Sequence, residues 1–161
     1  MRYSMNLVIK LLLIPMTLFT FNANAANPSF NHKGIQKGAT STSCYRDPCS
    51  IVKVMNFKLL KNTSDYRLIK LKVVGGREGW ESEKTVWNHS FHDLYITCSL
   101  KKPSVKNEDQ VTIIPINRQE AVPGVLYADT TLYLKACHNF DGESTDAAKK
   151  YGYNIKEADR F

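Results

Sequence analysis

The sequence lacks the patterns that mark membrane spans and several common catalytic sites. After residue 25, the 161-residue chain has no run of 18 apolar residues, so we expect no membrane-spanning helix there. It has no Gly-x-Ser-x-Gly motif, which argues against the nucleophile elbow of an α/β-hydrolase. The glycines at 75, 76 and 79 lack the Gly-Lys-Ser/Thr ending of a phosphate-binding loop, so residues 74–79 are predicted to form an exposed, flexible loop instead.

Residues 1–25 have the three parts of a secretory signal peptide. Arg2 and Lys10 supply the positive start, and residues 11–21 form a nearly unbroken apolar core. Residues 22–25 end in the small-x-small pattern that signal peptidase cleaves. An uncleaved membrane anchor is the alternative, but the apolar core is short for a span. We therefore expect a bacterial exported protein, periplasmic or secreted, with no transmembrane segment in the mature chain.

The mature chain is predicted to contain one folded unit. Residues 26–43 are polar and are expected to form a flexible N-terminal segment. Residues 44–161 have the length of an ordinary single globular domain. With 43% apolar and 23% charged residues, the sequence belongs to neither the disordered nor the membrane-embedded class.

An even number of cysteines in an exported protein predicts disulfide bonds. Three pairings of the four cysteines are possible, and we favour Cys44–Cys49 with Cys98–Cys137. The first bond closes a tight loop that contains an Asp-Pro turn signal. Bonds from Cys44 or Cys49 to the later cysteines are the alternative, and they would tie the N-terminal segment to the core.

Hydrophobic alternation predicts a sheet. Apolar and polar residues alternate over 55–59 and again over 69–73, and a turn cluster at 61–65 separates the two runs. This pattern predicts an antiparallel hairpin. The clearest further strand covers residues 93–100, after a short strand around 85–87.

The later part of the chain predicts short strands and helices. Residues 111–116 form another apolar run, with Pro115 marking an edge or an end. Residues 125–138 fit a short helix better than a strand, and a second short helix is expected at 144–151, ended by Gly152. The predicted fold class is α+β: a mainly antiparallel sheet with one or two short helices, stapled by disulfides.

Basic residues are concentrated in one part of the chain. The mature chain has 20 basic and 15 acidic residues, a net charge of +5, and residues 50–80 account for the whole excess. Lys58, Lys70 and Lys72 fall on the polar face of the predicted hairpin, where they form a stripe. The stripe is either a solvated strand face or a contact for an anion, such as an acidic protein, a lipid head group or a cell-wall polymer.

Arg77 and Trp80 complete the candidate binding residues, because exposed Arg and Trp are frequent interface anchors. Trp80 is also compatible with a lid over the core. The stripe lacks exposed aromatic side chains of its own, since Phe57 falls on the apolar face. Bases of single-stranded nucleic acid stack on such side chains, so we expect no nucleic acid partner.

The histidines offer an alternative chemistry. His89 and His92 stand three residues apart, next to Asp93, and either could act as a base with that carboxylate or with Asp141. A zinc site would need two further ligands, and oxidised cysteines cannot supply them. We therefore expect no metal centre and no cofactor.

Two hypotheses follow. The first is an exported, non-enzymatic binding protein of the bacterial envelope, acting as an inhibitor or immunity-type protein on an acidic protein partner. The second is a small cell-envelope hydrolase that uses a His/carboxylate pair. The first is favoured because the sequence shows a localised charge and no catalytic constellation.

Overall fold

A computed structural model describes residues 30–81 and 84–156, and within these ranges the chain forms an antiparallel sheet and two α-helices. The predicted signal peptide lies outside the described residues. The six strands are β1 (Thr40–Ser43), β2 (Cys49–Asn62), β3 (Tyr66–Glu78), β4 (Val86–Ser99), β5 (Ser104–Asn107) and β6 (Gln110–Ile113). The helices are α1 (Tyr127–His138) and α2 (Ser144–Tyr151), with short 3-10 turns η1 (Lys33–Ile35) and η2 (Gly124–Leu126).

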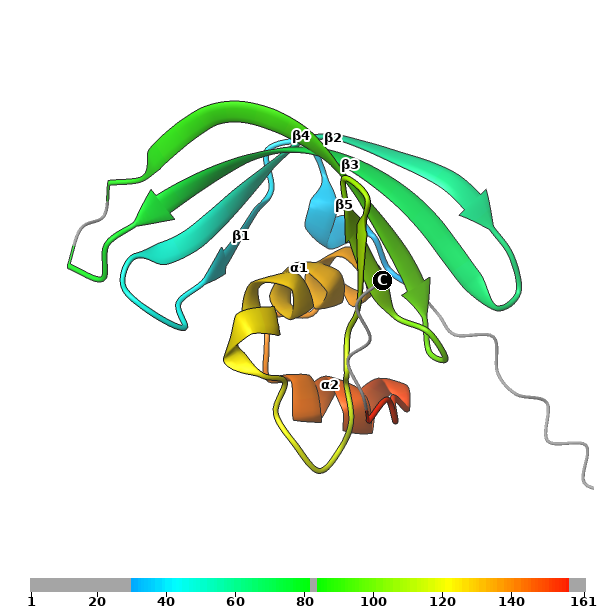
Figure 1. Ribbon diagram of the computed structural model, residues 1–161. Coiled ribbons are helices and arrows are strands. Elements are labelled where there is room, and N and C mark those ends of the chain that lie inside the picture. The colour runs from blue at the N-terminus through cyan, green and yellow to red at the C-terminus, as the bar shows by residue number, and fades with distance from the viewer. Residues whose placement is uncertain (1–29, 82–83, 157–161) are drawn as a thin grey trace, which may run out of the picture.

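The strands are hydrogen-bonded in the order in which they occur in the sequence, each antiparallel to its neighbour. The long strands β2, β3 and β4 arch over the helices, so that α1 lies beneath the sheet and α2 lies beyond α1 (Figure 1). This arrangement confirms the predicted fold class. It also confirms the predicted hairpin, because β2 and β3 are joined at residues 63–65.

The core lies between the concave face of the sheet and α1. Inward-facing residues of the central strands, such as Ile69, Leu71 and Ile96, are fully buried against Leu134 and Ala136 of the helix. Leu71 and Leu94 are directly opposite each other in the register of β3 and β4, so their side chains share this face. Both predicted helices are present, and Gly152 ends α2 in a left-handed conformation as expected.

Both favoured disulfides are confirmed: Cys44–Cys49 closes the loop before β2, and Cys98–Cys137 joins β4 to α1. Beside the second bond, hydroxyl groups form a buried chain. The Tyr133 hydroxyl lies 3.1 Å from both backbone polar atoms of Ser99 and 2.9 Å from the Tyr153 hydroxyl. These hydrogen bonds give partners to polar groups that would otherwise be buried in the core without one.

The N-terminal boundary differs from the prediction. Residues 26–43 were expected to form a flexible segment, yet from Phe30 onward the chain is built into the fold. Ile35 of η1 is fully buried in the core, and β1 pairs with β2 along its whole length. The segment is polar because hydroxyl residues fill β1, and this composition resembles a loop.

The predicted loop at 74–79 is also wrong over most of its length. Strand β3 continues to Glu78, and the two glycines lie within it. A Cβ on Gly76 would lie 2.9 Å from the Trp87 ring and 3.1 Å from Ile51, so glycine is needed for the close approach of these side chains. The predicted strands at 85–87 and 93–100 are parts of one strand, β4.

Candidate binding face

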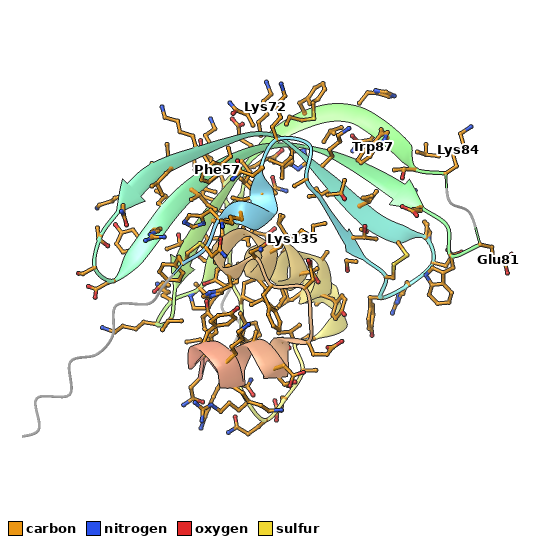
Figure 2. The ribbon with its side chains drawn as sticks, turned by 180° about the vertical axis from the view of Figure 1, so that it is seen from behind. Phe57, Lys72, Glu81, Lys84, Trp87 and Lys135 are labelled. Carbon is orange, nitrogen blue, oxygen red and sulfur yellow. A yellow bond between two sulfur atoms is a disulfide. The ribbon has the colours of Figure 1, made fainter. Side chains whose placement is uncertain are left out.

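Three lysines meet on the outer, convex face of the sheet. Lys58 of β2 is directly opposite Lys70 of β3, and Lys72 is directly opposite Asn56. Side chains of directly opposed residues project to the same side of a sheet. Figure 2 shows Lys72 on the side away from the helices. Like charges placed opposite each other destabilise a sheet, so the Lys58–Lys70 pair carries an electrostatic cost.

One carboxylate partly neutralises the cluster. Asp93 of β4 is opposite Lys72, and its Oδ2 lies 2.7 Å from Nζ of Lys70. The hydrogen bond from Lys70 to Asp93 raises the pKa of the lysine. Lys58 and Lys72 form no ion pair with any residue in the described ranges. Together with Asn56, these four side chains line a shallow depression that retains a positive charge.

Aromatic rings from β4 lie on the same face. The ammonium groups of Lys53, Lys70 and Lys72 lie over the rings of Trp87, Tyr95 and Phe91, at 5.8, 5.5 and 5.8 Å from the ring centres. Phe91 is 54% exposed, which is unusual for a side chain of this size. Hereafter the outer face means these eight residues: Lys53, Lys58, Lys70, Lys72, Trp87, Phe91, Asp93 and Tyr95.

The aromatic content of this face corrects one premise of the sequence analysis. The lysine stripe was expected to lack exposed aromatic side chains, because Phe57 points to the concave face, as Figure 2 shows. The rings come from β4 instead, which pairs with β3 through contacts that are distant in sequence. Only the register of the sheet reveals them.

Arg77 and Trp80 are not part of the outer face. Arg77 is directly opposite Ser50, whose side chain faces the concave side of the sheet, so Arg77 does not share the outer face. Trp80 follows in the next loop, where its side chain is largely exposed. Its backbone N–H donates a hydrogen bond to Asp47 Oδ1 in the loop closed by the first disulfide. These two candidates therefore lie at one end of the sheet, away from the lysine cluster.

The structure does not assemble the predicted His/carboxylate pair. His92 and Asp93 are consecutive residues of β4, so they point to opposite faces of the sheet: His92 borders a concave-side cavity, and Asp93 borders the outer depression. His89 is exposed and has a positive φ of 57°. Asp141 follows α1, and its Oδ1 accepts a hydrogen bond of 2.9 Å from Nζ of Lys135 in that helix.

In the ranges 30–81 and 84–156, no group of three or more His, Cys, Asp or Glu side chains is arranged to hold a metal ion. None of the helices in these ranges combines the length and the apolar character that crossing a membrane requires. Comparison of the chain with protein-family models, with curated proteins and with solved structures gives no match.

Proposed function

We propose that the protein is an exported, non-enzymatic binding protein of the bacterial envelope, periplasmic or secreted, that binds an acidic protein partner through its outer face. The observation that carries this proposal is the cross-strand pair of Lys58 and Lys70 with Lys72 beside it. A cluster of like charges on a rigid sheet costs stability, and contact with an anionic surface would offset that cost.

The aromatic rings strengthen the proposal. Protein interfaces are enriched in aromatic side chains at their centres, surrounded by polar groups. On the outer face, Phe91 and Trp87 can supply the apolar contacts, and the lysines can supply charge complementarity. The mature chain is itself basic, so a basic target would be repelled at long range. An acidic target would instead be attracted, and we therefore propose an inhibitor or immunity-type protein that acts on an acidic protein. The two disulfides are compatible with an oxidising compartment.

Charge reversal of two outer-face lysines tests the proposal. The protein is immobilised, exposed to envelope and secreted proteins, and the retained proteins are purified for binding measurements. With Lys70→Glu and Lys72→Glu together, we expect the affinity for an acidic partner to fall at least about tenfold, because attraction becomes repulsion. Raising the salt concentration should weaken the complex with the unmodified protein.

The matched control reverses two exposed lysines that lie outside the sheet, Lys149 of α2 and Lys156, which follows that helix (Lys149→Glu with Lys156→Glu). This variant has the same net charge as the test variant and should keep its affinity for the partner. Equal weakening by both variants would mean that only net charge matters and that the outer face is not the binding site. If anionic polymers or lipid vesicles are bound while no protein is, the acidic protein partner is replaced by that ligand class.

A further inference from the structure

Polar side chains occupy inward-facing positions at one end of the sheet. Ser43 of β1 is directly opposite Ser50 of β2, and Ser41 is opposite Val52, so all four side chains face α1. His92 is opposite Val73, and Asn107 is opposite Leu94, which places both polar residues on the same concave face. Over the middle of this face, inward residues such as Ile69, Leu71 and Ile96 are apolar and form the core.

These polar residues border one cavity between the sheet and the first turn of α1. Its volume is about 160 Å³. Its polar lining consists of Ser41, Ser43, Ser50, His92, Asn107 and Asp129. Val52, Leu94 and Leu132 contribute an apolar wall. The cavity is separated from the outer face by the sheet itself, so it is independent of the proposed protein-binding face.

Two buried serine residues of β1 are the strongest evidence for a ligand. Ser41 and Ser43 are 9% and 8% exposed. Neither side chain forms a hydrogen bond with any residue in the part of the chain that the structure describes. Among the fully enclosed side-chain polar atoms of the described residues, only His138 Nδ1 lacks a hydrogen-bond partner, so the two serine hydroxyl groups are accessible from the cavity and can bond to a molecule there. Both lie at positions where a strand facing a core would carry apolar residues, so they indicate a cavity that receives a polar molecule.

The lining defines the chemistry of that molecule. Serine hydroxyls can each donate and accept hydrogen bonds, as can a neutral imidazole and a side-chain amide. Sugar hydroxyls have the same double capacity, and the C–H groups on the face of a sugar ring suit the apolar wall. The lining contains one carboxylate, Asp129, and no lysine or arginine, which disfavours an anion. A cavity of about 150 Å³ is large enough for one six-membered ring. We propose that this cavity binds a single neutral sugar ring.

Titration by NMR tests the proposal on the disulfide-intact protein. The probes are glucose, galactose and N-acetylglucosamine up to about 50 mM, because one small ring gives weak, millimolar binding. We expect at least one probe to cause saturable shifts in backbone amides of β1 and of the first turn of α1. Ser43→Ala should weaken that binding about fivefold or more, since it removes one buried hydroxyl group and little volume.

Ser50→Phe places a large side chain at an exposed position beside the cavity and should abolish the shifts. Ser64→Phe, in the exposed turn between β2 and β3, is the matched control and should leave them unchanged. The proposal is overturned if none of the three sugars causes saturable shifts, which would mean that the cavity holds water alone. It is equally overturned if the shifts persist in a folded Ser50→Phe protein.

Discussion

A protein in which Cys98 and Cys137 are both replaced by alanine is expected to lose about 4 kcal/mol of unfolding free energy. The bond joins β4 to α1 across 39 residues, and it restricts the unfolded chain strongly because this loop is long. Both cysteines are fully buried, so their replacement also removes core contacts. The total free energy of unfolding of a small domain is about 5–15 kcal/mol. Urea denaturation should show the loss, and the melting temperature should fall by roughly 10–20 °C.

The Cys44–Cys49 disulfide provides an internal comparison. Cys44 and Cys49 are five residues apart, so the same reasoning gives a loss of about 2 kcal/mol for their double alanine variant. The larger effect should therefore belong to the bond with the longer loop. If the two variants lose equal free energy, or if the order is reversed, restriction of the unfolded chain is not the main source of stabilisation.

Local alternation was sufficient to predict the central hairpin, and the tight Asp-Pro loop between Cys44 and Cys49 favoured the observed pairing of the cysteines over the alternatives. Residues 55–59 and 69–73 show the period of two that strands require, and Cys98 falls on the inward face of its strand. The helices were also detectable, since Gly152 marks the end of α2. The hairpin, the short disulfide loop and the end of α2 depend on neighbours in sequence, so the sequence alone contained the signal for them.

The errors arose where distant contacts override local preference. Glycines 75 and 76 suggested a loop, but packing of Trp87 against Gly76 keeps them in a strand. Between Trp87 and Phe91, the pairing of β4 with β3 is irregular. This irregularity interrupts the alternation in β4, so one strand resembled two. Recognising a single strand would have placed His92 and Asp93 on opposite faces and removed that candidate pair.

The candidate binding residues illustrate the same limit. Lys58, Lys70 and Lys72 belong to adjacent strands of one hairpin, so alternation predicted their shared face. Phe91 and Tyr95 join them only through the register of β3 and β4. The inward hydroxyl groups of β1 had no detectable signal, because a short run of serine and threonine resembles a polar linker. These hydroxyl groups border a cavity only because α1 covers this side of the sheet.

Stability is expected to fall as the pH drops from 6.5 to about 4, mainly because of His138. This residue is 5% exposed, and its ring stacks on Tyr151 with 3.8 Å between ring centres. Its Nε2 atom lies 2.7 Å from the Tyr153 hydroxyl, while Nδ1 has no hydrogen-bond partner in the described part of the chain. Burial, with smaller contributions from the nearby positive groups of His32 and Lys150, lowers the pKa of His138 from 6.5 to about 4.

The direction of the effect follows from proton uptake. Above pH 6.5, the imidazole is neutral in both the folded and unfolded chains, so this group adds no pH dependence. Between pH 6.5 and 4, the unfolded chain takes up a proton that the folded chain does not, and the free energy of unfolding falls. The full loss is about 3 kcal/mol. Burial also lowers the pKa of His32, which adds a loss of the same sign.

His138→Phe isolates this contribution, because phenylalanine keeps a ring against Tyr151 and cannot be protonated. The Tyr153 hydroxyl can still donate its hydrogen bond to Tyr133. Urea denaturation of both proteins between pH 7.5 and 4.5 should show a much smaller fall for the variant, with most of the difference between pH 6.5 and 5. Carboxylates titrate in both proteins and cancel in the comparison. Parallel curves for the two proteins would mean that His138 is not the group whose protonation opposes folding.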